Sequence, residues 1–247
     1  MAETVGVEET EGDGVAALDR LASAFASHPR GLINTFEGGD GFGKTTQLKR
    51  LKEELESRGL TLGEDFHATF EPGATPLGAQ LRHLIQHGPS DVDPRTEALL
   101  YAADRAYHVS TVVRPALTRG QHVLQDRYID SSVAYQGAAR ELGGEEIRGL
   151  SQWATNQLEP DLTLLFDLDV EAGLGRVGGE ADRIESAGLD FHRRVREGYL
   201  TLAQQNPDRY AVIDASGSVD EVFDRVVQTL NTALAVPPGE PGEQGSQ

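Results

Sequence analysis

A glycine-rich segment that ends in a lysine and a threonine carries the clearest chemistry in this sequence. Residues 38–45, GGDGFGKT, match the pattern G-x-x-x-x-G-K-[ST] and lie between the apolar run 31–37 and an amphipathic stretch. Glycines let backbone N–H groups and a helix N-terminus face phosphates, so Lys44 would bridge the β- and γ-phosphates and Thr45 would ligate Mg²⁺. The segment therefore predicts a phosphate-binding loop that takes ATP as the donor. The residues expected at the donor are Gly38, Gly39, Asp40, Gly41, Phe42, Gly43, Lys44, Thr45 and Thr46.

Other classes of nucleotide-binding protein share this loop, and the rest of the sequence argues against them. A GTPase would carry a guanine-reading N-K-x-D segment, whereas all three lysines of this chain lie between residues 44 and 52. A motor or transporter ATPase would end its second catalytic strand in an acidic pair, whereas the run 121–125 leads into Asp126-Arg127-Tyr128. These features favour a kinase of small molecules.

Several further segments, in a fixed order along the chain, resemble the motif set of thymidylate kinases. The similarity runs from about residue 31 to about residue 234 and leaves out both termini. It implies a P-loop kinase fold, transfer of the γ-phosphoryl group of ATP to dTMP with Mg²⁺, and a homodimer. The matching segments are FEGxDGxGKTTQ at 36–47, EPGxT at 71–75, DRY at 126–128, SSxAYQG at 131–137, PDLT at 160–163 and DRIE at 182–185.

The acceptor is expected just past the run 121–125, where ligands of open α/β sheets collect. Arg127 stands there, and its planar fork suits a monophosphate dianion. Asp126 beside it would hold Mg²⁺ through water, as the resemblance also implies. The resemblance further implies that Asp40 lies near the 3′-hydroxyl of the acceptor sugar and that Glu71, in the EPG segment, belongs to the acceptor site.

The base and the sugar of the acceptor have their own candidate residues. Tyr101 and Arg105 are four residues apart, so on a helix they share one face and can grip a single ligand, although an aromatic at helical spacing also suits a core position. The resemblance implies that Tyr101 stacks on thymine and that Arg105 bonds the base or the phosphate. It places Ser132 and Tyr135 where the pyrimidine edge is read and a ribose 2′-hydroxyl is crowded, with Gln136 as a further candidate.

Two departures from the family pattern concern the phosphates. Members with the EPG segment often carry arginine before its glutamate, and here that residue is Phe70. The segment 176–183, which resembles the family's lid, has only two arginines, Arg176 and Arg183. We expect these two to stabilise the charge of the transition state, and the paired glycines between them to let the lid close and exclude water.

The sequence leaves two rival functions open. The phosphate of a nucleoside monophosphate has a second pKa of about 6, so its attacking oxygen is already ionised at neutral pH and needs no general base. A deoxynucleoside kinase would need such a base, and Glu71 could supply it. The second rival is a nucleotide-binding regulatory protein whose lid no longer supports catalysis.

The composition indicates an enzyme of the cytoplasm that acts on small molecules. A formal charge of −18 opposes binding to DNA, RNA or anionic lipid, and the absence of cysteine excludes disulfides and suits a reducing compartment. The N-terminus is acidic and no apolar run approaches the length that spans a bilayer, so we expect neither a signal peptide nor a membrane helix.

Short apolar runs alternate with longer amphipathic stretches, a pattern typical of a parallel sheet with helices on both faces. We expect a P-loop kinase domain at 31–235, with five parallel strands and a short lid, after an acidic extension at 1–30 that contains a helix at 15–27. Residues 1–13 and the tail 236–247 are too polar to fold alone and are predicted to be disordered. Strands are expected at 31–37, 66–70, 121–126, 162–168 and 210–214, and helices at 44–58, 76–87, 95–118, 145–158, 186–205 and 218–234.

Overall fold

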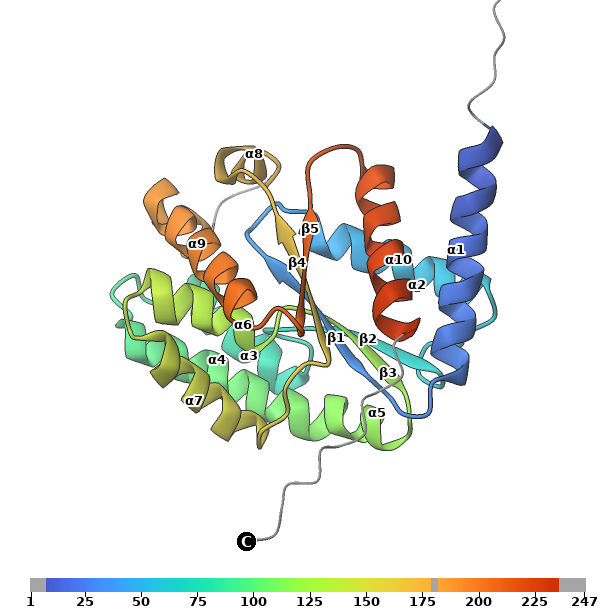
Figure 1. Ribbon diagram of the computed structural model, residues 1–247. Coiled ribbons are helices and arrows are strands. Elements are labelled where there is room, and N and C mark those ends of the chain that lie inside the picture. Colours follow the sequence, from blue (N-terminus) through green and yellow to red (C-terminus); the bar gives the residue numbers. More distant parts are fainter. Residues whose placement is uncertain (1–7, 179–181, 236–247) are drawn as a thin grey trace, which may run out of the picture.

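Five parallel strands in the order β2-β3-β1-β4-β5 form the centre of the protein. The computed structural model describes residues 8–178 and 182–235, and Figure 1 shows helices on both sides of the sheet. The prediction of an α/β fold with a five-stranded parallel sheet is confirmed. The strands are β1 (Ile33–Gly38), β2 (Phe66–Phe70), β3 (His122–Asp126), β4 (Leu162–Asp167) and β5 (Tyr210–Asp214).

Helices occupy the connections between these strands. α1 (Glu8–Ser27) precedes β1, α2 (Lys44–Ser57) follows β1, and α10 (Val219–Ala235) follows β5. Among the residues that the structure describes, no helix has the length and apolar character needed to cross a bilayer. The other helices are α3 (Pro76–His87), α4 (Pro94–His108), the π-helix η1 (Val109–Val113), α5 (Arg114–Thr118), α6 (Ile129–Ser132), the π-helix η2 (Val133–Ala139), α7 (Gly144–Thr155), α8 (Val170–Leu174), the 3₁₀-helix η3 (Glu185–Ala187) and α9 (Leu189–Gln205).

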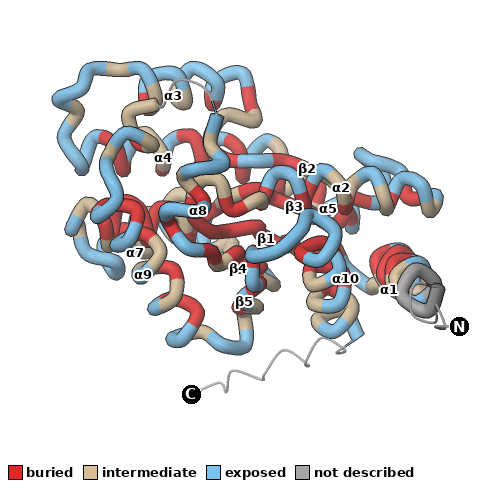
Figure 2. The backbone as a smooth tube through the Cα atoms, turned by 90° about the horizontal axis from the view of Figure 1, so that it is seen from above, coloured by how far each residue is buried: buried red, intermediate tan, exposed pale blue. Residues whose placement is uncertain are grey.

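Different helices cover the two faces of the sheet. α1, α2 and α10 pack on one face, over buried strand residues that include Phe36 and Phe166. α4, α7, α9 and η2 lie on the other face, where Leu165 and Val195 are buried. Successive strand residues point to opposite faces, so a sheet covered on both sides needs strands that are apolar throughout. Figure 2 shows the buried residues concentrated along the strands and on the inner sides of the helices.

The carboxyl ends of the strands meet at one edge of the sheet. Phe36 in β1 pairs with Asp126 in β3, and Gly38 in β1 pairs with Phe166 in β4. The loops that follow β1, β2 and β3 therefore leave the sheet side by side. Ligands of open parallel sheets bind at this edge, so the register alone indicates where the functional side chains gather.

The predicted strands and most predicted helices lie within three residues of the observed ones, and the exceptions are local. The predicted helix 95–118 is helical throughout but contains the π-helical turn η1. The predicted helix 186–205 is interrupted at Gly188, whose φ of 87° separates η3 from α9. Residues 129–139, for which no element was specified, form α6 and η2.

The N-terminal helix is longer than predicted and contributes to the core. The prediction that residues 1–13 are disordered is wrong for residues 8–13, which begin α1, and its part on residues 1–7 lies outside the described residues. Leu21 and Phe25 of α1 are buried in the cluster formed with α10, and the Asn231 side chain donates to the backbone oxygen of Ala17 at 2.8 Å. The boundary at residue 30 stays a prediction, and the predicted disorder of 236–247 lies outside the described residues.

We predict that α1 is required for the stability of the whole domain. Leu21 is completely buried and Val15 on the same helix is 54% exposed. Leu21→Ala should lower the free energy of unfolding by roughly 2–5 kcal/mol, because it leaves a cavity in the core. Val15→Ala, the matched control, should change it by less than about 0.5 kcal/mol. Urea unfolding measures both values, and equal effects of the two substitutions would contradict the packing of α1 on α10.

Candidate active site

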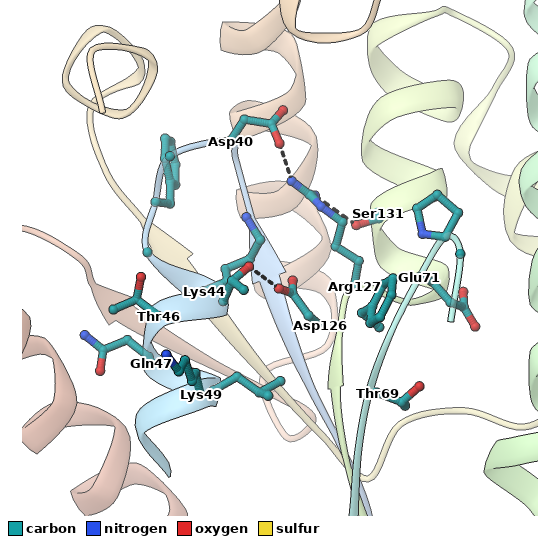
Figure 3. Close-up of a pocket in the computed structure, with 18 of the residues that line it drawn as sticks. Asp40, Lys44, Thr46, Gln47, Lys49, Thr69, Glu71, Asp126, Arg127 and Ser131 are labelled. Carbon is teal, nitrogen blue, oxygen red and sulfur yellow. Dashed lines mark hydrogen bonds and ion pairs between the residues drawn. The ribbon is translucent and has the colours of Figure 1, made fainter. Parts of the chain in front are cut away.

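A cavity of about 1380 Å³ opens at the carboxyl edge of the sheet. Its walls come from the loop after β1, the end of β2, α3, α4, the loop after β3 and the loop between β5 and α10. Figure 3 shows Lys44, Asp126 and Arg127 directed toward a common space at this edge. A typical pocket for one small molecule measures roughly 300–1000 Å³, so this cavity is large enough for two ligands.

The loop after β1 has the geometry that a phosphate site requires. Gly41 and Gly43 adopt φ values of 75° and 89°, in the left-handed region that glycine occupies at no steric cost. α2 begins at Lys44, so the unpaired N–H groups of its first turn face the cavity together with the positive end of the helix. The sequence pattern therefore folds as a phosphate-binding loop at the start of a helix.

Lys44 extends back across this loop. Its Nζ donates a hydrogen bond to the backbone oxygen of Gly39 at 2.6 Å, and the side chain is buried. Burial, together with the nearby charge of Arg127, lowers the pKa of Lys44 to about 8. A phosphate group beside Nζ would favour the charged form again, since opposite charges stabilise each other in a buried site.

Thr45 and Asp126 meet at the mouth of the loop and form the candidate Mg²⁺ site. The Thr45 hydroxyl donates a hydrogen bond to Oδ2 of Asp126. Both groups are hard oxygen ligands of the kind that Mg²⁺ prefers, and Mg²⁺ normally takes one or two protein oxygens together with water and phosphate. The two residues therefore fit the predicted ion.

Arg127 connects the phosphate-binding loop to the acceptor side. Its NH2 group donates to Oδ1 of Asp40 at 2.6 Å, and its NH1 group donates to Gly38 at 3.1 Å and to the Ser131 hydroxyl at 3.2 Å. Although burial favours the neutral form of Asp40, the adjacent Arg127 charge keeps the pKa of this carboxyl below its usual value. The guanidinium is thus a fixed cation at the centre of the cavity.

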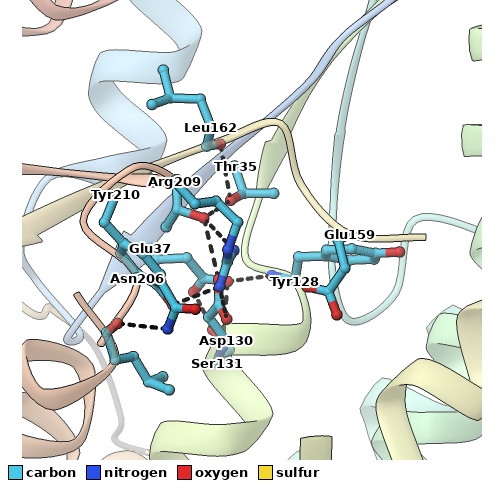
Figure 4. Close-up of polar contacts among 12 residues, drawn as sticks. Thr35, Glu37, Tyr128, Asp130, Ser131, Glu159, Leu162, Asn206, Arg209 and Tyr210 are labelled. Atoms are coloured by element: carbon cyan, nitrogen blue, oxygen red, sulfur yellow. Dashed lines mark hydrogen bonds and ion pairs between the residues drawn. The ribbon is translucent and has the colours of Figure 1, made fainter. Parts of the chain in front are cut away.

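The backbone of Arg127 is left-handed, with a φ of 65°, which is uncommon outside glycine. Buried Glu37 holds the peptide that follows it: Oε1 accepts the N–H of Tyr128 at 2.7 Å. Oε2 accepts the hydroxyls of Ser131 at 2.6 Å and Tyr199 at 2.9 Å, and Figure 4 shows Glu37 beside Tyr128 and Ser131. Burial, and then the charge of Asp130, raises the pKa of Glu37. Glu37 therefore orients the segment from which Arg127 projects.

A second buried carboxylate, Asp130, lies in the segment that follows Arg127 and is held by residues of neighbouring strands and loops. Arg209 binds it with both terminal nitrogens, at 2.7 and 2.9 Å, and the Thr163 hydroxyl donates to it at 3.2 Å. Figure 4 shows this group between β4 and the start of α6. A bidentate arginine compensates for the cost of burying a carboxylate near Glu37.

Tyr135 and Asp40 form the boundary between the two halves of the cavity. The Tyr135 hydroxyl donates to Oδ2 of Asp40 at 2.8 Å, and the Arg127 guanidinium lies 5.2 Å from the centre of the Tyr135 ring. Tyr101 on α4 and Ser132 line the same half of the cavity. An aromatic face and a hydroxyl thus meet beside a cation, which is an arrangement suited to a nucleoside monophosphate.

Glu71 is fully engaged by its neighbours. Arg105 donates from Nε to Oε2 at 2.8 Å, and His108 Nδ1 lies 2.8 Å from Oε1. Arg105 is itself buried and donates from NH1 to the Ser132 hydroxyl at 3.1 Å and from NH2 to the backbone oxygen of Tyr128 at 3.1 Å. Both carboxylate oxygens of Glu71 are therefore engaged by side chains of α4.

The two arginines of the segment 176–183 lie in different surroundings. Arg176 lines the cavity. Arg183 instead donates from NH1 to Oε2 of Glu97 at 2.7 Å, on the carboxylate that also accepts Gln136 at 2.9 Å. The expectation that paired glycines make this segment flexible falls partly on residues 179–181, which lie outside the described residues.

The structure brings most of the predicted site residues to one cavity, while their catalytic and binding roles stay predictions. Gly38, Gly39 and Arg183 do not line it, although the two glycine carbonyls bind Arg127 and Lys44. The lining residues from the prediction are Asp40, Gly41, Phe42, Gly43, Lys44, Thr45, Thr46, Glu71, Tyr101, Arg105, Asp126, Arg127, Ser132, Tyr135, Gln136 and Arg176.

Sequence reasoning missed two parts of the cavity wall, as well as the supporting residue Glu37. Arg82, His83, Gln86 and His87 of α3 form one of these parts. Ala215, Gly217, Ser218 and Val219, between β5 and α10, line the donor half. The segment DASGS directly after the apolar run 210–213 was a usable signal, since loops at this end of a parallel strand bind ligands. A glutamate within an apolar run, as at Glu37, was the other signal, because fully buried charges are rare.

Comparison with known proteins agrees with this geometry. The family model for thymidylate kinase matches residues 36–226, which is most of the chain. A thymidylate kinase of Bifidobacterium longum subsp. infantis is 50% identical over 208 residues, covering 83% of this chain and 88% of that protein. A thymidylate kinase of Leifsonia xyli subsp. xyli is 54% identical over 195 residues, covering 78% and 90%.

A solved structure supports the same assignment. The crystal structure of thymidylate kinase from Ehrlichia chaffeensis aligns with a TM-score of 0.67 and 30% identity, over 82% of this chain and 99% of that one. The matched region contains the phosphate-binding loop, Arg127 and the acceptor wall. The chain therefore belongs to the thymidylate kinase family of nucleoside monophosphate kinases.

Proposed function

We propose that the chain transfers the γ-phosphoryl group of ATP to dTMP. The position of Arg127 carries the proposal, because its guanidinium lies between Asp40 of the donor loop and Ser131 and Tyr135 on the acceptor side. A cation at that point can hold the acceptor phosphate while Lys44 holds the end of the donor. The names of the relatives describe the same reaction for those proteins.

The transfer needs charge neutralisation and alignment more than proton chemistry. An oxygen of the dTMP phosphate attacks the γ-phosphorus, the bond from the γ-phosphorus to the bridging oxygen breaks, and ADP leaves. The second pKa of a phosphate monoester is about 6, so the attacking oxygen is already ionised at neutral pH. Lys44, Arg127 and Arg176 supply positive charge where the transferring group carries most of its negative charge.

Thr45 and Asp126 are proposed to hold the Mg²⁺ that accompanies ATP. When bound, the ion would neutralise charge on the β- and γ-phosphate oxygens. The two side chains share a hydrogen bond, so their oxygens lie close enough together to ligate one ion. This leaves Lys44 free to reach the phosphates from the other side of the loop.

The rival functions lose support from the geometry. A deoxynucleoside kinase would use Glu71 as a base, yet both oxygens of Glu71 are bound by Arg105 and His108. A regulatory protein without catalysis would not need a cation between its two ligands, and Arg127 is held there by Asp40 and Ser131. The kinase of a nucleoside monophosphate accounts for each of these contacts.

The cytoplasm is the proposed location, with ATP and dTMP as the ligands and neither nucleic acid nor membrane as a partner. The chain has no cysteine, so its stability does not depend on an oxidising compartment. Its formal charge of −18 opposes association with polyanions and anionic lipid.

A homodimer is proposed through the outer face of α4 and α7, which lie side by side in Figure 1. Three large apolar side chains there face solvent: Leu99 is 57% exposed, Tyr107 41% and Trp153 79%. A groove of about 280 Å³ beside Leu99, lined by Leu142 and Leu150, continues the apolar surface. Several large apolar side chains exposed on one pair of helices often mark a protein interface, and a second copy of the chain is the simplest occupant.

We predict that substitutions of Lys44 and Arg127 affect the kinetics of different substrates. Lys44→Ala should lower kcat by about 10²–10³-fold, because it removes a cation from the donor phosphates. Arg127→Ala should raise KM for dTMP far more than KM for ATP, since the guanidinium is proposed to bind the phosphate of dTMP. Steady-state kinetics with each substrate varied measures both. Arg20→Ala, on an exposed arginine of α1, is the control and should resemble the unaltered protein.

The reverse pattern would contradict the assignment. Loss of ATP affinity with dTMP affinity retained in Arg127→Ala would put this arginine on the donor side. Normal turnover in a folded Lys44→Ala protein would remove the phosphate-binding loop from the reaction. Thermal unfolding of each variant shows whether the fold survives.

We predict that Tyr135 selects deoxyribose. Tyr135→Ala should narrow the ratio of kcat/KM between dUMP and UMP, because truncation opens the space that a 2′-hydroxyl needs. Tyr101→Ala should lower kcat/KM for both nucleotides alike, since lost stacking does not sense the sugar. The assignment would be wrong if Tyr135→Ala left the ratio of kcat/KM between dUMP and UMP unchanged while Tyr101→Ala altered it. Tyr101 would then be the residue that senses the sugar.

We predict that charge on the α4–α7 face dissociates the dimer. The double variant Leu99→Glu/Trp153→Glu should sediment as a monomer at concentrations where the unaltered protein sediments as a dimer, because two carboxylates cannot be buried without partners. Val15→Glu places the same charge on an exposed position of α1 and should leave the dimer intact. A monomer in the unaltered protein would refute the dimer itself.

A further inference from the structure

The Phe42 side chain is buried, although it belongs to the phosphate-binding loop. It is only 3% exposed and shares an apolar cluster with Leu168 and Val170, at the start of α8. A phosphate-binding loop uses backbone N–H groups at such a position, so binding of the donor does not account for an aromatic ring there. The contacts that the ring makes with neighbouring residues must therefore explain its presence in the loop.

The ring lies directly on the backbone of α8. A β-carbon added at Gly173 would be 2.4 Å from Cε1 of Phe42, and one added at Gly39 would be 2.8 Å from Cζ of the same ring. Contacts shorter than 3.0 Å essentially never occur for real β-carbons. These two glycines thus leave the space that the ring fills, and the ring is held between the donor loop and α8.

The backbones of the two segments also touch. A β-carbon at Gly41 would be 1.9 Å from the carbonyl oxygen of Gly173 and 3.2 Å from Cγ2 of Val177. The same carbonyl oxygen of Gly173 accepts the N–H of Arg176 at 2.9 Å. Figure 1 shows α8 above the loop that joins β1 to α2. The donor loop and the segment that leads to Arg176 are therefore packed as one unit.

Arg176 is the residue whose position this packing controls. It follows Gly173 by three residues and lines the cavity. Arg183, the other arginine of the segment 176–183, pairs with Glu97 and does not line the cavity. Within the described part of this segment, Arg176 is thus the arginine available to the phosphates.

We propose that Phe42 is a positioning residue for Arg176. Its ring joins the donor loop to α8 and so fixes the start of the segment that carries Arg176 relative to the loop that binds the phosphates. A guanidinium that is already in place stabilises the transition state without first being ordered, and a displacement of about 1 Å can cost about 10²-fold in rate. The proposal rests on the proposed role of Arg176 in phosphoryl transfer.

A compensation experiment tests the contact itself. Gly173→Ala puts a methyl group where the ring lies and should lower kcat at least about tenfold, with KM for dTMP nearly unchanged. Adding Phe42→Ala vacates that space, so the two losses should not multiply, and the double variant should be no slower than the slower of the two single variants. Gly175→Ala is the matched control, because its methyl group would face only the preceding helical turn, and it should retain full activity. Losses that multiply in the double variant would overturn the packing argument.

A double-mutant cycle tests whether Phe42 acts through Arg176. Arg176→Ala should lower kcat strongly in the unaltered chain and only slightly in the Phe42→Ala background. In that background Arg176 is already displaced and contributes little to kcat, so its removal changes little. A merely structural role of the ring would give the full product of the two effects, and that result would overturn the proposal. Phe42→Leu, which keeps most of the apolar volume, replaces Phe42→Ala if the alanine variant does not fold.

The cycle also separates this inference from the function on which it rests. If Arg176→Ala alone leaves kcat unchanged, the role proposed for Arg176 is wrong and the positioning role falls with it. If Arg176→Ala lowers kcat but the effects multiply, only the positioning role is wrong. The expected result is a loss of at least about tenfold from Arg176→Ala that shrinks to less than about threefold in the Phe42→Ala background.

Discussion

The left-handed backbone of Arg127 is the constraint on which the geometry of the cavity depends. A non-glycine residue at a φ of 65° carries strain of roughly 1 kcal/mol or more, and it persists because the surrounding structure holds it. Glu37 does so by accepting the N–H of Tyr128, the peptide that follows. With the chain turned at this point, β3 stops at Asp126 and the Arg127 guanidinium points toward Asp40 instead of along the sheet. The conformation of one residue therefore links the donor loop to the acceptor wall.

That conformation depends in turn on buried charges that need partners. Glu37 and Asp130 are both fully buried, and each would be costly if unpaired. Glu37 is satisfied by two N–H groups and two hydroxyls, and Asp130 by the bidentate contact of Arg209. Removing one partner would leave a buried carboxylate without its hydrogen bonds and close to a second carboxylate. The contacts of Glu37 and Asp130 therefore depend on each other, and together they form a buried polar layer beneath the cavity. This layer stiffens the acceptor side, where a small displacement changes the rate.

The sequence predicted what depends on local patterns and missed what depends on distant partners. The five strands follow from apolar runs, and the donor loop follows from glycines at fixed spacing before Lys44. Residues 129–139 were given no element because their helical turns are short and are held by Glu37, which lies 91 residues before Tyr128. The pairing of Arg183 with Glu97 could not be read either, since no spacing rule joins a residue after β4 to α4. The resemblance to family motifs suggested which side chains bind the substrates, but it did not predict which residues those side chains contact within the protein.

The charge of the chain and the charge of its cavity have opposite signs, and this difference explains how an acidic protein can bind two phosphorylated ligands. Among the described residues, seven lysines and arginines line the cavity against five aspartates and glutamates, and they include all three lysines of the chain. Over the whole sequence the acidic residues outnumber the basic ones by 40 to 22. A cleft with low-dielectric walls concentrates the field of the charges that line it, while the outer surface is screened by salt within about 10 Å. The confinement of lysine to residues 44–52 thus concentrates positive charge at the part of the cavity that the proposed function assigns to the triphosphate.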